Sequence, residues 1–281
     1  MSWGFWPGRG QTVIALHGIT AQYANFVGVA ERMEGRRPLL ALDLRGRGGS
    51  TKPDGPYGMS THAADVAAAM EAFAIGPSVV VGHSMGAFVA TALAAEHPEA
   101  VSALVLVDGG LPLEPPPGIP PEQVLDTALS AQVERLSRTF ASPEDYLAFW
   151  RALPPFSGGR WNRWVEDYLR KDLAGADHCY RPQAFEQAVR ADFLDCADAE
   201  RIRSRLASLE VPVLLLRASE GFNPGDPPLC SDETVARESV LVADFRDRVL
   251  HGCTHYTIAL GETGAQVVAD AVVEMAEECR S

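Results

Sequence analysis

A serine lies inside a pentapeptide framed by two glycines, GHSMG at residues 82–86. The pentapeptide directly follows the apolar run Ser78–Val81 and opens a helical pattern, Met85–Glu96. A turn this tight between a strand and a helix leaves no room for side chains at the glycines, and its strain lifts the serine hydroxyl clear of the sheet. Amides at the start of the helix point toward the serine, where negative charge develops. The pattern predicts that Ser84 is a nucleophile, with His83 as a packing residue behind the turn.

A histidine near the end of the chain has the chemistry of a general base. The run HGCTHYTI, residues 251–258, follows a short apolar run and precedes the helical pattern Glu262–Glu278. His255 lies in a Thr-His-Tyr turn, where a neutral imidazole can accept the proton of Ser84 and later return it to a leaving group. The two histidines and the cysteine of this run could also suggest a metal, but such a site needs further ligands, and none lies nearby in the sequence. We therefore expect no metal.

The elements that must position these residues are short apolar runs bounded by turn residues, which predict buried parallel strands. The runs are Thr12–Leu16, Leu39–Leu42, Ser78–Val81, Leu104–Val107, Val213–Leu216 and a shorter sixth, Arg248–Leu250. The helical patterns between and after them are Ala24–Met33, Thr61–Ala74 with Ser60 as its N-cap, Met85–Glu96 and Glu262–Glu278. This alternation predicts an α/β fold with a doubly wound, mostly parallel sheet that is covered by helices on both faces.

The alternation is interrupted by a long segment rich in proline and aromatic residues. It opens with LPLEPPPGIPP at residues 111–121 and continues with the helical patterns Glu122–Phe140 and Pro143–Ala152. We predict that residues 111–205 form an inserted helical cap on a core made of residues 1–110 and 206–281. The aromatic side chains could form the cap's own core or line an apolar pocket, and we favour a cap in which they do both. The residues that we expect to line the substrate pocket are Tyr146, Trp150, Phe156 and Trp164.

Taken in chain order, these motifs resemble the α/β-hydrolase superfamily over nearly the whole chain. The motifs are HGI at residues 17–19, DLRGRGGS at 43–50, GHSMG at 82–86, LVLVDGG at 104–110 and THYT at 254–257. The resemblance implies acyl transfer to water without a cofactor: Ser84 attacks a carbonyl, and water then cleaves the acyl-enzyme. It also implies that the backbone amides of Ile19 and Met85 form the oxyanion hole. In the same scheme His17 braces its loop, and the turn at residues 43–50 is architectural.

The same resemblance leaves two places for the carboxylate that orients the base. One place follows the run VPVLLLR at residues 211–217, but the position expected for the acid is occupied by Gly221, and Glu220 stands one residue early. The other is the carboxyl end of the strand after the nucleophile helix, where Asp108 is followed by two glycines that leave room for an imidazole. Lactone hydrolases that act on zearalenone are members of the superfamily with their acid at this second place. We favour Asp108 and keep Glu220 as the alternative.

The aromatic segment and its low charge favour a serine hydrolase that cleaves a small apolar ester or lactone, of the carboxylesterase or lactonase type. The same fold also hosts carbon–carbon bond hydrolases, cofactor-free dioxygenases and acyl transferases, which share the serine and the base. Dehalogenases and epoxide hydrolases are disfavoured, because they need a carboxylate nucleophile where Ser84 stands. A receptor that binds a small ligand with little turnover is an alternative from a different class.

Composition limits the partners and the compartment. The length of 281 residues allows one buried core with an inserted subdomain, and the net charge of -13 argues against nucleic acid. No run of eighteen apolar residues occurs, and the start MSWGFWPGRG lacks a signal peptide's features, so we expect neither a membrane span nor export. Five cysteines without a CxxC pair favour a reducing, cytoplasmic location. The expected partner is a small apolar substrate, and the expected state is a monomer or homodimer.

Overall fold

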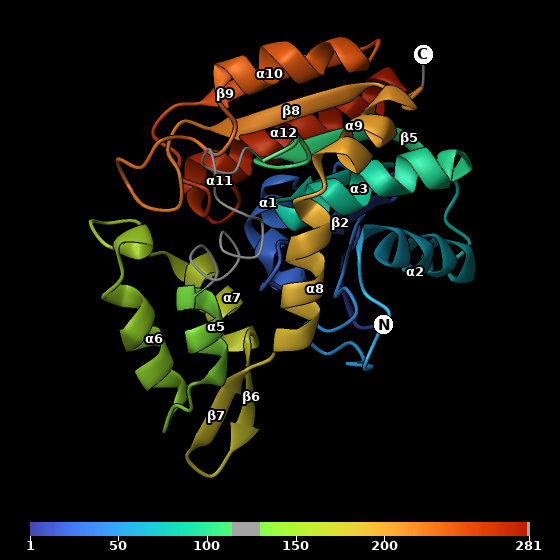
Figure 1. Cartoon of the computed structure of the whole chain (residues 1–281). Helices are drawn as coiled ribbons and strands as arrows, with labels where there is room; N and C mark the ends of the chain where they lie inside the picture. Colours follow the sequence, from blue (N-terminus) through green and yellow to red (C-terminus); the bar gives the residue numbers. More distant parts are fainter. Residues whose placement is uncertain (114–129, 280–281) are drawn as a thin grey trace.

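A seven-stranded sheet forms the centre of the molecule in the computed structural model, which describes residues 1–113 and 130–279 (Figure 1). Neighbouring strands run parallel, except for the antiparallel pair at one edge, β1 and β3. In spatial order the strands are β1 (Trp3–Trp6), β3 (Leu39–Leu42), β2 (Val13–Leu16), β4 (Ser78–His83), β5 (Val101–Val107), β8 (Val213–Ala218) and β9 (Phe245–Leu250). The predicted fold class, a doubly wound and mostly parallel sheet, is confirmed.

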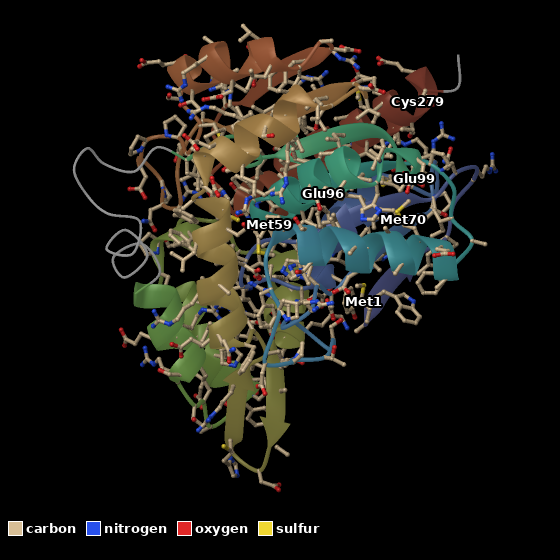
Figure 2. The ribbon with its side chains drawn as sticks, turned by 45° about the vertical axis from the view of Figure 1, so that its right-hand side comes forward. Met1, Met59, Met70, Glu96, Glu99 and Cys279 are labelled. Carbon is tan, nitrogen blue, oxygen red and sulfur yellow. The ribbon has the colours of Figure 1, made fainter. Side chains whose placement is uncertain are left out.

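Alternate side chains of each strand enter two apolar layers, one on each face of the sheet. In β2, for example, Ile14 and Leu16 belong to one layer, whereas Val13 and Ala15 belong to the other. The first layer is covered by α2 (Met59–Ala72), α3 (Met85–Glu96), α9 (Ala199–Ala207) and α10 (Asp232–Glu238), and the second by α1 (Val27–Arg32), α11 (Thr257–Leu260) and α12 (Glu262–Glu278). Figure 2 shows the first covered face, with Met59 and Met70 of α2 and Glu96 at the end of α3 labelled. Short 3-10 helices are η1 (Tyr23–Phe26), η2 (Pro98–Ala100), η3 (Pro154–Phe156) and η4 (Ser239–Leu241).

Strand β1 was not among the predicted strands, and its side chains explain why. It is the edge strand of the sheet and pairs only with β3, and its residues alternate between exposed and half-buried. Trp3 and Phe5 are 48% and 55% exposed, so β1 lacks the fully buried apolar run that identified the other strands. At the opposite edge, β9 begins three residues before the predicted run Arg248–Leu250, since its first half includes two charged residues and no fully buried one.

The segment inserted between β5 and α9 forms a body with its own apolar core (Figure 1). Its described elements are α5 (Ser130–Ser137), α6 (Pro143–Arg151), η3, α7 (Arg163–Lys171), the hairpin β6 (Leu173–Ala176) and β7 (Cys179–Pro182), and α8 (Glu186–Cys196). Helix α6 matches the predicted pattern Pro143–Ala152, and the first part of the predicted helix Glu122–Phe140 lies outside the described residues. The hairpin was not predicted, because LAGA and CYRP are mostly exposed and lack an apolar pattern.

Helix α9 belongs to the core by its packing, although most of it lies within the predicted cap range. Ile202 and Leu206 enter the same apolar layer as α2 and α3. The Arg205 guanidinium donates to Glu96 Oε1 at 3.0 Å and to Ser60 Oγ at 2.8 Å, which joins α9 to both helices. The predicted boundary at residue 205 therefore falls inside a core helix.

The start of α2 differs from the prediction that Ser60 caps this helix. The N-cap is Gly58, which has no side chain to offer, and Ser60 lies inside the first turn. Two carboxylates of α8 accept the free amides instead: Asp192 Oδ1 from Gly58 N–H and Asp195 Oδ2 from Met59 N–H, both at 2.6 Å. The capping groups come from more than 130 residues away in the sequence, so local capping rules do not reveal them.

Among the described residues, none of the helices has the length and apolar character that crossing a membrane requires.

Candidate active site

Ser84 occupies a strained turn between β4 and α3. Its φ of 56° is unusual for a residue with a side chain, and it arises because the strand reverses into the helix within one residue. A Cβ at Gly82 would lie 2.2 Å from the carbonyl oxygen of Gly86, and a Cβ at Gly86 would lie 1.9 Å from that of Leu16. Both glycines are therefore required for the close approach of backbones that presents the Ser84 hydroxyl, as the motif predicted.

His255 and Asp108 extend from Ser84 in a chain of hydrogen bonds. His255 Nε2 lies 3.0 Å from Ser84 Oγ, and His255 Nδ1 lies 2.6 Å from Asp108 Oδ2. The other Asp108 oxygen accepts the Ala218 amide at 3.1 Å, and the His255 amide donates to the Gly221 carbonyl at 2.9 Å. With the proton of a neutral imidazole on Nδ1, the lone pair of Nε2 faces the serine hydroxyl. The structure thus brings together the residues predicted as nucleophile, base and favoured acid.

Glu220, the alternative acid, has a hydrogen-bond partner other than the imidazole. Its Oε2 accepts the Gly225 amide at 3.0 Å within its own loop, while Asp108 occupies the far nitrogen of His255. A Cβ at Gly221, where the acid was otherwise expected, would lie 2.6 Å from the carbonyl oxygen of Pro227. The backbone of this loop therefore leaves no space for a carboxylate at residue 221.

The loop after β2 lies directly against the nucleophile. A Cβ at Gly18 would lie 3.2 Å from Ser84 Cβ, and Ile19 and Met85 both line the cavity in front of the serine. His17 Nδ1–H donates to the Gly18 carbonyl at 2.8 Å, and His17 Nε2 accepts the Leu44 amide at 3.0 Å. The Gly18 carbonyl and the Ile19 N–H belong to one rigid peptide plane, so His17 fixes the direction of that N–H. Burial lowers the pKa of His17 to about 4, which keeps it neutral for this role.

His83 supports the base from behind. Its Nε2–H donates to the backbone carbonyl of His255 at 2.9 Å, and its ring centroid lies 4.8 Å from that of His255. Asn25 Nδ2 lies 3.3 Å from His83 Nδ1 and donates to it, which fixes the tautomer. Burial, with the nearby His255, lowers the pKa of His83 to about 3. His83 is buried behind the turn, as predicted. Asn25 was not predicted, because it lies 58 residues away and no local motif marks it.

A cavity of about 410 Å³ opens in front of Ser84. Its walls come from the loop after β2, the start of α3, the loop after β5, the end of α8, the turn after β8, the base loop and a single residue of α7. The lining residues that project beyond the immediate site are Ala21, Phe88, Leu113, Tyr168, Phe193, Cys196, Ala197, Phe222, Pro227, Pro228, Leu229 and Tyr256. Most are apolar, and among the described residues no lysine or arginine lines the cavity.

The four aromatic residues predicted to line this cavity lie elsewhere. Tyr146, Trp150 and Phe156 are buried in the core of the inserted segment, and Trp164 packs against Gly28 and donates from its indole to Glu31 at 3.0 Å. The prediction was wrong because a small inserted body needs these large side chains for its own core. The aromatic rings that do reach the cavity are Phe88, Tyr168, Phe193, Phe222 and Tyr256.

The spacing of His251, Cys253 and His255 brings no set of metal ligands together. His251 is exposed, Cys253 is buried, and His255 faces Ser84 and Asp108. Within residues 1–113 and 130–279, no group of three or more His, Cys, Asp or Glu side chains could hold a metal ion. All five cysteines are free thiols.

Several known proteins resemble the chain in sequence. A family model described as the alpha/beta hydrolase fold matches residues 11–221. The chain is 29% identical to 2-(acetamidomethylene)succinate hydrolase of Mesorhizobium japonicum over 89% of this chain and 83% of that protein. It is 30% identical to N-formylmaleamate deformylase of Pseudomonas putida over 76% of this chain and 72% of that protein.

Solved structures show the same architecture. The crystal structure of E-2-(acetamidomethylene)succinate hydrolase superposes with a TM-score of 0.78 at 26% identity, covering 96% of this chain and 93% of that chain. The Mycobacterium tuberculosis esterase Rv0045c superposes with a TM-score of 0.74, covering 98% of this chain and 88% of that chain. Its identity of 21% supports the likeness of fold alone.

The two buried neutral histidines predict a loss of stability in acid. The pKa values of His17 and His83 fall from 6.5 to about 4 and about 3 in the folded state. Below pH 6.5 the unfolded chain therefore binds protons that the folded chain does not, so stability falls as the pH falls. Between pH 7 and 5 each histidine should contribute about 2 kcal/mol of this loss. Urea unfolding at pH 7 and pH 5 should show this loss of unfolding free energy. The His83→Gln variant should lose less stability between these pH values than the wild-type protein. An equal loss in both proteins would contradict the assignment.

Proposed function

Because the chain belongs to the α/β-hydrolase fold family, we propose that it is a serine hydrolase that cleaves small, uncharged apolar esters or lactones through an acyl-enzyme on Ser84. The observation that carries the proposal is the chain of hydrogen bonds from Asp108 through His255 to the Ser84 hydroxyl, which opens into a mostly apolar cavity. A binding protein with little turnover has no need for a strained serine aligned with a base and a buried acid.

Each step of the reaction has a residue in place. Ser84 Oγ attacks the carbonyl carbon while His255 Nε2 accepts its proton, and Asp108 stabilises the imidazolium. The amides of Ile19 and Met85 stabilise the oxyanion. Collapse breaks the bond to the leaving alkoxide, which takes the proton from His255. A water molecule, deprotonated by His255, then attacks the acyl-enzyme, releases the acid and restores the Ser84 hydroxyl.

The charge of the site favours a neutral substrate over the acids named for the two relatives. A succinate or maleamate carboxylate in an apolar cavity needs a cation to offset its desolvation. The described lining of the cavity carries no such cation. Residues 114–129 contain no lysine or arginine either, whereas they contain Glu114, Glu122 and Asp126. The net charge of -13 also repels anions.

A panel of neutral and anionic substrates tests the proposal. We expect p-nitrophenyl butyrate or hexanoate and uncharged lactones to be hydrolysed with kcat/KM at least ~10-fold above that for an ester of similar length that ends in a carboxylate, because burying that unpaired charge costs more than ~1.4 kcal/mol. Ser84→Ala is the control and should abolish both turnover and labelling by a fluorophosphonate. Preference for the anionic ester, or turnover no higher than in Ser84→Ala, would contradict the proposal. Cleavage of a diketone or oxygen uptake with a heteroaromatic compound would instead favour a carbon–carbon hydrolase or a dioxygenase.

The identity of the acid is tested by a pair of substitutions. Asp108→Asn should lower kcat by about 10⁴, because the amide favours the wrong tautomer of His255. Glu220→Gln should leave kcat within about 3-fold, since its carboxylate accepts the Gly225 amide of its own loop while Asp108 contacts His255. Steady-state kinetics with equal thermal unfolding midpoints would make the comparison direct. The reverse pattern would assign the acid to Glu220.

A second pair of substitutions tests which aromatic residues belong to the core of the inserted segment and which belong to the cavity wall. Phe156→Ala should cost about 3–5 kcal/mol of unfolding free energy but change KM little, since Phe156 is buried in the segment's core and is not one of the described residues that line the cavity. Phe193→Ala should cost less stability, because its side chain is only half-buried, and should change KM several-fold as it removes part of the wall. Denaturant unfolding and ester kinetics measure both. A larger change in KM for Phe156→Ala than for Phe193→Ala would show that Phe156 contacts the substrate after all.

A further inference from the structure

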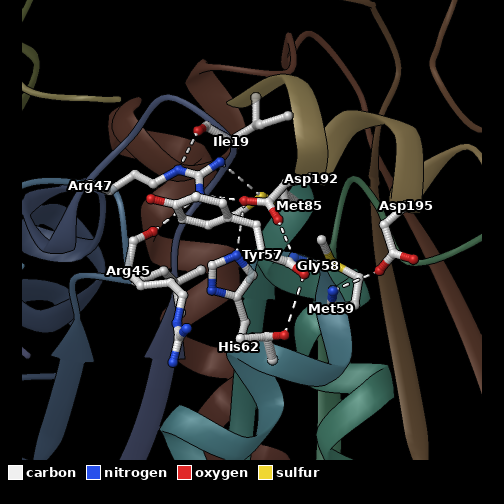
Figure 3. A network of polar contacts seen from close by, with 12 residues as sticks. Ile19, Arg45, Arg47, Tyr57, Gly58, Met59, His62, Met85, Asp192 and Asp195 are labelled. Atoms are coloured by element: carbon white, nitrogen blue, oxygen red, sulfur yellow. Dashed lines mark hydrogen bonds and ion pairs between the residues drawn. The ribbon is translucent and has the colours of Figure 1, made fainter. Parts of the chain in front are cut away.

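Arg47, in the turn after β3, is fully buried and joins the two residues assigned to the oxyanion hole (Figure 3). Its Nε–H donates to the Ile19 carbonyl at 2.9 Å, and one terminal nitrogen lies 3.7 Å from Met85 Sδ. The other terminal nitrogen donates to the Arg45 carbonyl at 3.1 Å and pairs with Asp192. The guanidinium thus holds the loop that carries Ile19 against the start of the nucleophile helix.

The two peptide planes beside Ile19 are held by different side chains. His17 holds the plane that contains the Ile19 N–H, through the Gly18 carbonyl. Arg47 holds the next plane, through the Ile19 carbonyl. Because a peptide has only two soft dihedrals per residue, fixing both planes leaves Ile19 little freedom to turn its N–H away from the oxyanion.

Arg47 depends in turn on Asp192 of α8. Both side chains are fully buried, and Asp192 also accepts His62 Nε2–H at 2.9 Å and the Gly58 amide at 2.6 Å. Burial alone would raise the pKa of Asp192, but the hydrogen bond from His62 and the charge of Arg47 lower it below its usual value. The carboxylate is therefore ionised and compensates the Arg47 charge, which would otherwise be isolated in the interior.

Helix α8 carries this counter-ion and a wall of the cavity together. Phe193 and Cys196, which follow Asp192 by one and four residues, line the cavity, whereas Asp192 faces Arg47. When α8 packs against the turn after β3, the Asp192 carboxylate holds Arg47 in place, and Phe193 and Cys196 form part of the cavity wall. The position of α8 therefore determines both the cavity wall and the support that Arg47 gives to the loop that carries Ile19.

We infer that Arg47 and Asp192 are positioning residues that couple the seating of α8 to the geometry of the oxyanion hole. The inference rests on the proposed function, since it concerns how the Ile19 amide is aimed. Arginine suits the task because its planar fork donates in several fixed directions at once, to the loop, to its own turn and to the carboxylate. Lysine would keep the charge but could not make these contacts from one nitrogen.

Two substitutions and a matched control test the inference. Arg47→Lys keeps the charge beside Asp192 and is expected to fold, and Asp192→Asn removes the charge that holds Arg47. Glu238→Gln is the control: Glu238 is 1% exposed and paired with Arg203, and it is not among the described residues that line the cavity in front of Ser84. For each protein we would measure kcat and KM for p-nitrophenyl hexanoate, the affinity for an alkyl boronic acid, the rate of fluorophosphonate labelling and the thermal unfolding midpoint. The boronic acid forms a tetrahedral adduct on Ser84 and so reports the oxyanion hole.

The expected result separates positioning from a merely structural ion pair. Arg47→Lys and Asp192→Asn should lower kcat, boronate affinity and labelling rate about 10- to 100-fold, because a displaced donor loses contact mainly with the tetrahedral state. KM should change less than about 3-fold, and Glu238→Gln should leave these values unchanged.

Retention of kcat and boronate affinity within about 3-fold in Arg47→Lys would overturn the inference, whatever the variant's stability. If Asp192→Asn does not fold, Arg47→Lys alone decides. Failure of the wild-type protein to label would overturn the proposed function, whereas a labelled wild type with an equally reactive Arg47→Lys would overturn only this inference.

Discussion

The first turn of α3 lies so close to the end of β2 that no side chain fits between Gly86 and the carbonyl of Leu16. This approach brings the loop after β2 beside Ser84 and places Ile19 and Met85 on the wall of one cavity. The remaining partners arrive at the same edge from distant strands: Asp108 after β5 and His255 after β9. A parallel sheet makes this convergence general, because the carboxyl ends of its strands share one edge.

The site is built from buried neutral and ionised groups whose states are fixed by their neighbours. His17 and His83 stay neutral, so each keeps one donor and one acceptor nitrogen. Both donate to a backbone carbonyl, whereas His17 accepts from the Leu44 amide and His83 from the Asn25 side chain. Asp192 stays ionised and balances Arg47. The cavity itself is left mostly apolar and, in its described lining, without a cation. This division concentrates fixed dipoles at the serine and leaves the substrate's outer parts to apolar contact.

The sequence predicted the residues whose positions depend on local geometry. Ser84 was identified by the glycines that its turn requires, and His255 and Asp108 by their places after apolar runs, although the structure had to place Asp108, rather than Glu220, beside His255. Pocket residues were not predictable in this way, because periodicity does not tell whether an aromatic ring such as Trp150 faces a segment's own core or a substrate. Asp192 was also out of reach, since its partner Arg47 lies 145 residues away and an ion pair between such positions leaves no local pattern.

Because carboxylates of α8 cap the start of α2, the two helices are coupled in their local motions. Gly58 and Met59 donate their amides to Asp192 and Asp195, so these two hydrogen bonds at the start of α2 exist only while α8 is docked. The two segments, far apart in the chain, therefore form one cooperative unit of local unfolding. The rate at which the Gly58 and Met59 amides exchange with solvent would therefore report how often α8, and with it the cavity wall, detaches. The reporting amides lie at the start of α2, outside the described lining of the cavity.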